Sequence, residues 1–339
     1  MSFRAMTLQH QELPWTWPLQ LGNGVPMLRA RTIITAIDSR GHEHQAELAP
    51  CPGVHPETLG DACRLWQSTC APRLLSQSLV LNPWQWTRPY FGLIELPATP
   101  LRSVQTAVEQ LLLSWAQSQS PEVFSLADTM TLEGSALLAL QADRETSWQE
   151  FLQLWDQGFR IFKCKVGRLP ALHEFNCLQR MTQHGQGLLQ LRLDANRGMS
   201  SQDAAFWKNH SQGLPIVYWE EAAGFYPQAL DETLWDSHET IPAALAWILK
   251  PSRLSLSHTV HLLQKAAAEN IPCVLSNAFD SGLSLRCSAW IYAAFCKNPQ
   301  PLGFGTARFL PDDAWQSESW GASQVLVPGT PFAMRENRG

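Results

Sequence analysis

Short apolar runs alternate with amphipathic stretches along residues 135 to 306, and this alternation is the strongest constraint on the fold. The apolar runs SALLALQ at 135–141 and FRIFKCKVG at 159–167 are followed by the helical patterns TSWQEFLQLWDQG and ALHEFNCLQRMTQ. Strands that alternate with helices imply a parallel sheet, because each helix carries the chain back to the same edge. About eight such runs in roughly 175 residues predict closure into a (β/α) barrel.

Residues 1 to about 130 have a different pattern, which mixes strand and helix signals. Two strand-like segments, RARTIITAI at 29–37 and EHQAELA at 43–49, are joined by DSRG, which favours a hairpin turn. A helical pattern, SVQTAVEQLLLSWAQ, follows at 103–117. For the second part of the chain, a doubly wound open sheet is the alternative to a barrel. However, the glycine-rich phosphate turn typical of that fold does not follow residues 135–141.

The length and charge of the chain exclude several classes of partner. With 339 residues, 45% hydrophobic and 16% charged, the chain is long enough for a barrel and an appended domain. A net charge of -5 provides no basic stripe, so we expect no nucleic-acid partner. The apolar runs are too short to cross a bilayer, so we expect a cytoplasmic protein without a membrane partner. The eight cysteines lack paired CxxC spacing and are expected to be reduced thiols, and no pattern indicates an oligomeric state.

Charged residues recur where five consecutive predicted strands end. Alternate side chains of a strand share a face, so Lys163 and Lys165 point to one side, and Arg192 shares the face of Asp194 in the next strand. The charged residues at the strand ends, in chain order, are Lys163, Lys165, Asp194, Glu220, Glu221, Asp231 and Lys250. Each one alone would fit a helix cap or a solvent-facing side chain. Independent caps do not explain five strands in a row.

Carboxylates at the ends of adjacent strands would converge, because neighbouring strands lie only about 4.8 Å apart. Converged carboxylates take up protons unless a cation lies among them. Oxygen ligands without His or Cys select a hard ion, Mg²⁺ first and Mn²⁺ second. Lys165 can act as a base only when neutral, and burial together with the charges of Lys163, Lys250 and the ion favours its neutral form. A lysine base beside Mg²⁺ is a known arrangement for abstracting a proton next to a carboxylate, through an enediolate.

The order of these residues resembles the enolase superfamily, in particular its muconate-lactonising subgroup. The matching segments are KCK at 163–165, DAN at 194–196, EE at 220–221, DE at 231–232 and KP at 250–251. Within that subgroup the chain is most similar to the o-succinylbenzoate synthases, through ELAPCPGVHPET at 47–58, SNAFDSGL at 276–283 and LGFGT at 302–306. The resemblance implies a modified (β/α)8-type barrel, (β/α)7β, over residues 133–310. It also implies an α+β capping domain over residues 1–132, with residues 311–339 packing back on it.

The resemblance implies a metal site and a set of catalytic lysines. The residues that would bind Mg²⁺ are Asp194, Glu220 and Asp231. Lys165 would remove the proton α to the carboxylate of a small-molecule substrate and then return it to the leaving hydroxyl. Lys250 would shield the enediolate with its charge, and Lys163 would assist Lys165.

The resemblance also implies a substrate site. Arg192, Ser276 and Asn277 would bind the carboxylates of the substrate, and LGNGVPM at 21–27 would be a lid that excludes water. The implied activity is the Mg²⁺-dependent dehydration that forms o-succinylbenzoate from its cyclohexadiene precursor, in menaquinone or phylloquinone biosynthesis.

Two positions depart from the family pattern. The usual EEP is EEA here, at Glu220 to Ala222, which removes a rigid turn but no ligand. Only 11 positions separate Glu220 from Asp231, so little room remains for a helix between the fourth and fifth strands. Asp236 or Glu239 is therefore the alternative third metal ligand.

Three other functions stay open on the sequence. A racemase or epimerase of the same superfamily, for instance one acting on N-acylamino acids, could use lysines on both sides of the metal. A barrel that has lost activity and serves as a binding protein would need no Mg²⁺. A lyase forming a Schiff base through Lys165 is the third, disfavoured because such a site does not need three carboxylates.

Overall fold

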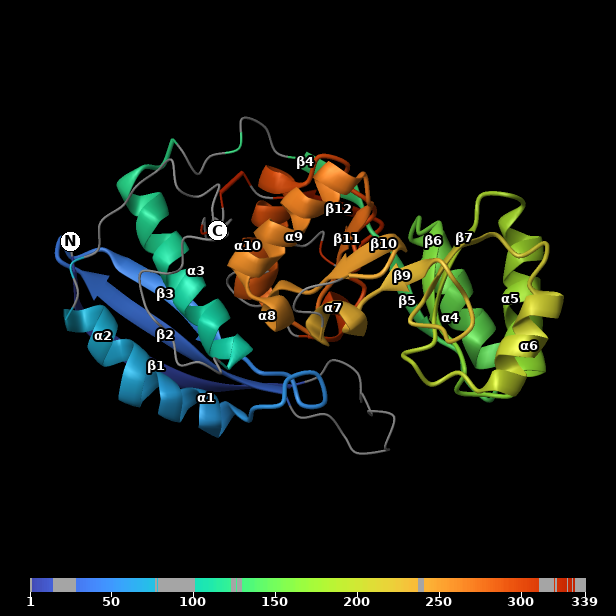
Figure 1. Ribbon diagram of the computed structural model, residues 1–339, viewed down its shortest axis with the longest axis horizontal. Helices are drawn as coiled ribbons and strands as arrows, with labels where there is room; N and C mark the ends of the chain where they lie inside the picture. The colour runs from blue at the N-terminus through green and yellow to red at the C-terminus, as the bar shows by residue number, and fades with distance from the viewer. Residues whose placement is uncertain are drawn as a thin grey trace.

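A computed structural model shows a cap domain joined to a barrel (Figure 1). The structure describes residues 2–14, 29–76, 78, 101–122, 126, 130–236, 241–310, 320, 322–327, 329–330 and 332. Residues 21–27, which the sequence predicts to be a lid, and Glu239 lie outside the described residues. The predicted fold class, a modified (β/α) barrel with an α+β cap, is confirmed.

The cap domain is an antiparallel sheet covered by helices. Its strands lie in the order β1 (Phe3–Leu13), β2 (Arg29–Asp38) and β3 (Glu43–Leu48). The β2–β3 connection is the hairpin that the DSRG segment predicts. The helical segments are α1 (Leu59–Leu65), a π-helical turn at Trp66–Cys70, α2 (Ala71–Ser76) and α3 (Arg102–Gln119). Because α3 contacts both β3 and the barrel helices α8 (Pro251–Leu254) and α9 (Leu256–Glu269), it joins the cap to the barrel.

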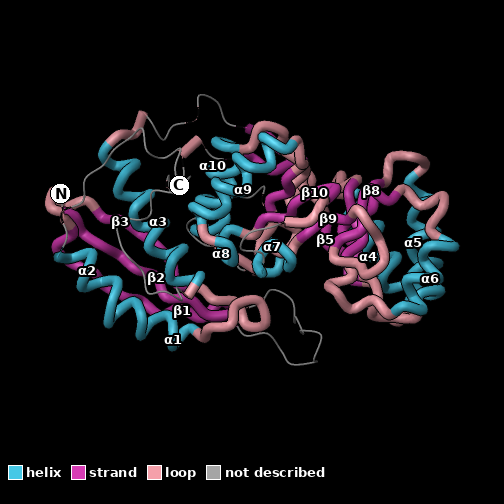
Figure 2. Tube along the Cα trace, viewed as in Figure 1, coloured by secondary structure: helices cyan, strands magenta, loops and turns pink. Residues whose placement is uncertain are grey.

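Seven parallel strands form the barrel sheet (Figure 2). In spatial order they are β5 (Ala136–Ala139), β6 (Ile161–Lys165), β7 (Gln190–Asp194), β8 (Ile216–Glu220), β9 (Gln228–Leu230), β10 (Ala244–Leu249) and β11 (Cys273–Leu275). The other barrel helices are α4 (Arg144–Asp156), α5 (Ala171–Gly185), α6 (Ser201–His210), α7 (Glu232–Asp236) and α10 (Gly282–Phe295). On α5 the buried residues Glu174, Cys177, Leu178 and Met181 recur at helical spacing, so this face packs on the sheet.

Residues 302 and 303 close the barrel where the sequence predicts an eighth strand. Leu302 bridges Gly134 just before β5, and Gly303 bridges Ser276 just after β11. The backbone at Gly305 then passes close to β5, because a Cβ added there would lie 2.7 Å from the backbone nitrogen of Leu137. The last strand of the predicted barrel is thus reduced to two bridges that rely on close backbone approach.

Replacing Gly305 with alanine is expected to lower the free energy of unfolding by about 1–3 kcal/mol, because the new methyl group overpacks the closure of the barrel. Urea denaturation of the purified variant measures this change. Gly60→Ala is the matched control, since a Cβ there meets its nearest neighbour, the Arg64 side chain, at 3.4 Å. A Gly305 variant as stable as the control would show that the approach is not tight.

The barrel wall is abbreviated between β8 and β9. Residues 221–227, all of them described, contain no helix, and β9 is three residues long. β8 and β9 share the single residue pair Glu220 and Ala229. In Figure 1 this narrow region connects a part containing β6, β7 and α4–α6 with a part containing β10, β11 and α8–α10. The spacing of Glu220 and Asp231 predicts that no helix fits between these strands, and this prediction is confirmed.

A buried glutamate of the cap holds the start of a barrel helix. The Glu109 carboxylate on α3 accepts hydrogen bonds from the backbone nitrogen of Leu256 at 2.5 Å and from that of Ser257 at 3.2 Å, at the beginning of α9. The Ser257 hydroxyl also donates to it at 2.7 Å. Glu109 therefore caps a helix in the other domain.

Replacing Glu109 with alanine should destabilise the protein by about 1–3 kcal/mol, because the buried donors at the start of α9 lose their acceptor. Thermal and urea unfolding of the variant measure the loss. Glu269→Ala removes an exposed carboxylate from the other end of α9 and serves as the control. Equal stability of the two variants would contradict the capping role.

A two-stranded antiparallel sheet lies beside the start of the barrel. It pairs β4 (Met130–Glu133) with β12 (Gln324–Val327), and β12 also contacts α10. The placement of residues 311–339 on the cap, and the domain boundaries, stay predictions. The eight cysteines, all within described ranges, are thiols. Within the part of the chain that the structure describes, no helix combines the length and apolar character needed to cross a membrane.

Candidate active site

Strand register places a lysine and two carboxylates side by side at the carboxyl ends of three neighbouring strands. Lys165 on β6 pairs with Asp194 on β7, and Asp194 pairs with Glu220 on β8. One layer deeper, Lys163 pairs with Arg192. Phe162 and Cys164 alternate with the lysines and are fully buried on the opposite face of β6, which turns the lysines inward. The convergence expected from the sequence is present for these residues.

Lys163 bridges two buried carboxylates. Its Nζ atom lies 2.6 Å from Oε1 of Glu220 and 2.8 Å from Oδ2 of Asp194. Burial opposes the ammonium form of Lys163, but the charges of Asp194 and Glu220 outweigh it and raise its pKa well above the ordinary value. Burial and the Asp194 charge raise the pKa of Glu220 to about 8. Asp194 and Glu220 thus already share one cation.

Lys165 also contacts Asp194 but has a different electrostatic balance. Its Nζ atom lies 2.6 Å from Oδ2 of Asp194 and donates to Oδ1 of Asn196. Burial lowers the pKa of Lys165, Asp194 opposes this shift, and the Lys163 charge adds to it. The net direction is downward, towards the neutral amine that a base requires.

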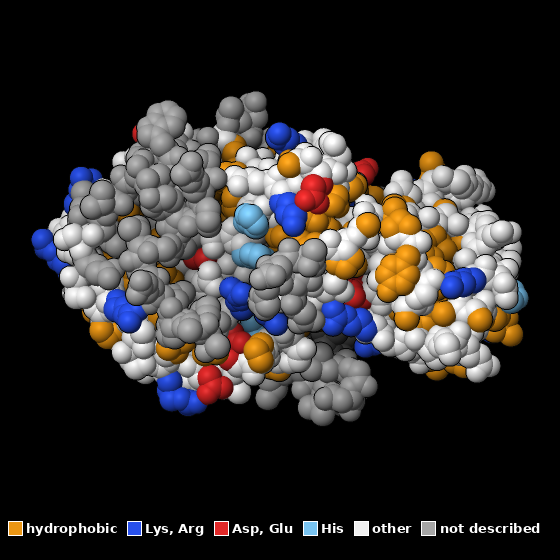
Figure 3. All heavy atoms as spheres, viewed as in Figure 1, with side chains coloured by type: hydrophobic (Ala, Val, Ile, Leu, Met, Phe, Trp, Pro, Cys, Tyr) orange, Lys and Arg blue, Asp and Glu red, His pale blue; other side chains and the backbone are white. Residues whose placement is uncertain are grey.

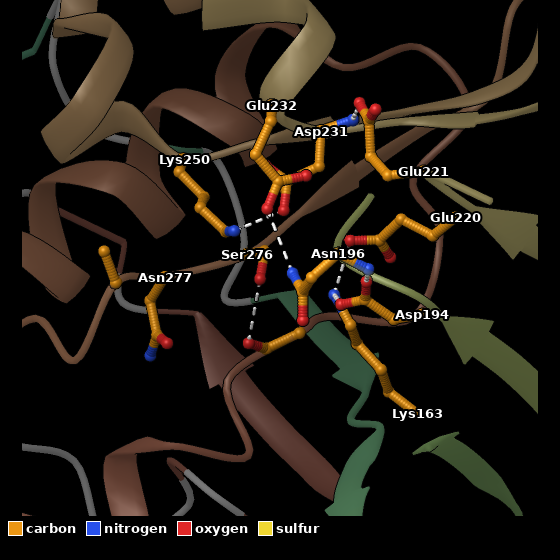
Figure 4. A network of polar contacts seen from close by, with 12 residues as sticks. Lys163, Asp194, Asn196, Glu220, Glu221, Asp231, Glu232, Lys250, Ser276 and Asn277 are labelled. Carbon is orange, nitrogen blue, oxygen red and sulfur yellow. Dashed lines mark hydrogen bonds and ion pairs between the residues drawn. The ribbon is translucent and has the colours of Figure 1, made fainter. Parts of the chain in front are cut away.

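Lys250 is paired with the third predicted ligand. Its ammonium group contacts Oδ2 of Asp231, which follows β9 directly, and lies 5.0 Å from the ring centroid of Trp235 on α7. Burial lowers the pKa of Lys250, but Asp231 outweighs burial and the net shift is upward. Figure 4 shows Lys250 and Asp231 facing the Asp194 and Glu220 side chains across the same mouth.

The donor set fits a hard divalent ion in its chemistry. Asp194, Glu220 and Asp231 are 0% exposed, and buried carboxylates need compensating charge. Oε2 of Glu220 and Oδ1 of Asp231 are buried and have no hydrogen-bond partner among the described residues. Within those residues no three His, Cys, Asp or Glu side chains are arranged as a ready-made metal site, since Asp231 turns to Lys250 while Asp194 and Glu220 turn to Lys163. An ion would therefore replace these lysine contacts.

The three residues predicted to bind substrate carboxylates lie in different places. Arg192 is in the deeper layer, donates to the carbonyl of Pro301 at 3.0 Å and lies over the Tyr218 ring. Ser276 and Asn277 follow β11 on the Lys250 side (Figure 4). Asn277 accepts a hydrogen bond from Thr306, and its Nδ2 atom is buried without a hydrogen-bond partner in the described part of the chain. Ser276 and Asn277 are thus placed at the mouth, whereas Arg192 lies below it.

Glu221 connects the end of β8 to the start of α7 and to the loop after β7 through hydrogen bonds, a role that the sequence does not reveal. Its carboxylate accepts hydrogen bonds from the backbone nitrogens of Asp231 at 2.8 Å and Thr233 at 2.7 Å, and from Nε of Arg197 at 3.1 Å. Glu221 and Arg197 have positive φ angles of 45° and 60°. Left-handed conformations in residues other than glycine gather at functional sites. The EE motif is therefore one carboxylate for the site and one for the scaffold.

Fold and site together define a capped (β/α) barrel with lysines and carboxylates at one mouth, the architecture of enolase-superfamily structures. The L-Ala-D/L-Glu epimerase from Bacillus subtilis has a TM-score of 0.78 at 20% identity over 98% of each chain. Muconate lactonizing enzyme from Pseudomonas putida has a TM-score of 0.77 at 15% identity, covering 97% of this chain and 95% of that one. An enolase-superfamily member from Roseovarius nubinhibens complexed with magnesium has a TM-score of 0.78 at 14% identity, covering 97% and 94%.

These comparisons establish the fold of the chain. A scan against protein-family models and a search of curated proteins each found no match. At such identities a structural likeness shows a shared architecture, and chemistry has to be argued from the residues at the site.

Proposed function

We propose that this protein is a Mg²⁺-dependent dehydratase of the enolase superfamily. Its substrate would be 2-succinyl-6-hydroxy-2,4-cyclohexadiene-1-carboxylate and its product o-succinylbenzoate, an intermediate of menaquinone or phylloquinone biosynthesis. The observation that carries the proposal is the contact of Lys163 and Lys165 with Asp194 and Glu220, opposite the Lys250–Asp231 pair. The segments at 47–58, 276–283 and 302–306, which resemble those of o-succinylbenzoate synthases, support this choice of substrate.

In this proposal each lysine has a separate task. Lys165 takes the proton α to the substrate carboxylate and becomes an ammonium. As the ring double bond forms and the C–O bond breaks, Lys165 returns that proton to the departing hydroxyl, which leaves as water. The Lys250 ammonium faces the negative charge that develops on the carboxylate, and Lys163 fixes the carboxylates of the site.

The same residues would hold the metal ion. Asp194, Glu220 and Asp231 are the proposed ligands, and the unpartnered oxygens of Glu220 and Asp231 support this choice. A bound Mg²⁺ would supply positive charge next to the reacting carboxylate. Asp236, at the end of α7, stays the alternative to Asp231, although Asp231 is the residue that follows β9 directly.

Unequal contacts of the two catalytic lysines favour dehydration over racemisation. A carboxylate and an aromatic ring both favour a charged amine, and Lys250 has both in Asp231 and Trp235. Lys165 instead shares Asp194 with a second ammonium, that of Lys163. A syn-dehydration needs one base and one fixed positive charge, which matches this difference. A two-base racemisation needs an amine that can become neutral on each side.

A racemase or epimerase of the superfamily is the second candidate, because the structural likeness to the L-Ala-D/L-Glu epimerase is as high as any reported above. The deciding experiment offers the purified protein the cyclohexadiene precursor and a panel of N-acylamino acids, each with Mg²⁺ and with chelator. We expect formation of o-succinylbenzoate that stops when Mg²⁺ is removed. Racemisation of an N-acylamino acid without dehydration would favour the second candidate, and binding of the precursor without turnover would favour an inactive binding protein.

A further inference from the structure

We propose that Asn196 is a positioning residue, held by Glu232, that aims the amine of Lys165 at the substrate. This inference rests on the proposed function, because Lys165 is the base in that proposal. Asn196 lies two residues beyond the end of β7, and Glu232 is the first residue of α7, beyond β9. Their contact therefore spans the end of β8.

Three contacts fix Asn196. Its backbone nitrogen donates to Oδ1 of Asp194 at 2.9 Å, and its side-chain Nδ2 atom donates to Oε1 of Glu232 at 3.0 Å. Its Oδ1 atom accepts a hydrogen bond from Nζ of Lys165. An ionised Glu232 carboxylate accepts and a Lys165 ammonium donates, so the NH₂ group of the amide turns to Glu232 and its carbonyl to Lys165. Figure 4 shows the Asn196 amide against the Glu232 carboxylate.

Packing does not explain the conformation of Asn196. The residue is exposed and has a φ angle of 43°, in the left-handed region, which asparagine adopts more readily than most residues with a side chain. The next residue, Arg197, makes a parallel link, donating from Nη2 to Oγ1 of Thr233 at 3.1 Å. Two successive residues after β7 are thus tied to two successive residues of α7. Residues 221–227, between β8 and β9, contain no helix, so these links connect the loop after β7 directly to α7.

The contact with Asn196 restricts the direction from which the Lys165 amine can accept a proton. Asp194 holds the Lys165 amine from the metal side, and the Asn196 carbonyl holds it from a second side, so the free lone pair of a neutral amine has one remaining direction. Proton transfer is sensitive to such alignment, and a displacement of about 1 Å can cost about 100-fold in rate. The Asn196–Glu232 pair would therefore affect the chemical step and leave substrate binding nearly unchanged.

The most specific test exchanges the hydrogen-bond donor and acceptor of the Asn196–Glu232 pair. In Asn196→Asp a second carboxylate would face Glu232, so we expect kcat for dehydration to fall by about 10- to 100-fold. Glu232→Gln alone keeps an acceptor for Asn196 but loses the charge that strengthens this hydrogen bond, so its kcat should fall less than that of Asn196→Asp. Combining the two substitutions restores a donor and an acceptor in reversed order, and keeps an oxygen for Lys165. Because the new carboxylate also favours the ammonium form of Lys165, the double variant should recover only part of the loss, with kcat at least about threefold above that of Asn196→Asp.

A second measurement does not depend on turnover. Lys165 in the metal-free protein is acetylated with trace acetic anhydride, and peptide mass spectrometry compares it with Lys208, an exposed lysine of α6. Asn196→Ala should raise the relative labelling of Lys165 several-fold, because the amine loses one of its two acceptors. In the same variant kcat should fall about 100-fold with KM within about twofold. Mg²⁺ affinity, measured by calorimetry, should stay unchanged.

Three results would overturn the proposal: a kcat of Asn196→Ala close to wild type, a change confined to KM, or a double variant no better than Asn196→Asp. Unchanged labelling of Lys165 in Asn196→Ala would overturn it as well. If the wild-type protein turns over none of the carboxylates offered, the proposed function fails. The labelling comparison still decides whether Asn196 holds the Lys165 amine.

Discussion

Lys165→Ala is expected to abolish dehydration and exchange of the substrate α-proton with solvent, with a loss of kcat on the order of 10⁴-fold. The loss is large because one amine both accepts the proton and returns it to the leaving hydroxyl in the proposed reaction. The fold should persist, with unfolding free energy within about 1 kcal/mol of wild type. Asp194 keeps its contact with Lys163 at 2.8 Å, so no carboxylate is left alone.

The measurement combines absorbance of the aromatic product with deuterium exchange followed by mass spectrometry. Lys208→Ala, on the exposed side of α6, is the matched control and should behave as wild type. Residual turnover of Lys165→Ala near the wild-type level would remove Lys165 as the base. Loss of exchange with retained Mg²⁺ binding would assign the defect to the proton-transfer step.

Asp194→Asn is expected to have the second largest effect, on both metal binding and stability. Replacing a residue that only hydrogen-bonds to a metal ligand typically weakens metal binding by about 10- to 100-fold. Asp194 is itself a proposed ligand, so its replacement should raise the Kd for Mg²⁺ by at least about 100-fold. The substitution also removes the carboxylate charge shared by Lys163 and Lys165. Removing one partner of a buried ion pair typically costs about 3 kcal/mol of unfolding free energy.

Calorimetric titration with Mg²⁺ and urea denaturation measure the two effects separately. Asp156→Asn, at the exposed end of α4, controls for the loss of a carboxylate elsewhere. Unchanged Mg²⁺ affinity together with lowered stability would leave Asp194 as a structural partner of the lysines. In that case the ion would have to be assigned to other carboxylates.

The convergence of side chains that the sequence predicts follows from strand alternation. Lys163, Lys165, Asp194 and Glu220 occupy short parallel strands in which every second side chain is apolar, so their direction is fixed by local pattern. Their convergence then follows from register between neighbouring strands. Arg192 shows where this reasoning stops: alternation places it on the correct face, but only the register shows that it lies in a deeper layer, against Pro301.

Contacts between segments that are not neighbours in the chain could not be predicted from the sequence. Glu221, Asn196 and Glu232 acquire their roles by joining the loop after β7 to the start of α7 across β8. No periodic pattern encodes such a connection, because it depends on how far the abbreviated wall brings α7 towards β7. The capping of α9 by Glu109 is of the same kind, since 147 positions separate the carboxylate from the backbone nitrogen that it accepts from.

The sequence by itself determined the parallel α/β architecture, the absence of a helix between the fourth and fifth strands, and the charged residues at the strand ends. Each of these is a local property, set by side-chain periodicity and by chain length between strands. Only the tertiary structure decided how the charges pair, which carboxylate oxygens stay without partners, and how two bridges at Leu302 and Gly303 close the barrel. These features depend on distances between segments far apart in the chain. Burial at those contacts then shifts the pKa values of groups such as Lys165 and Glu220.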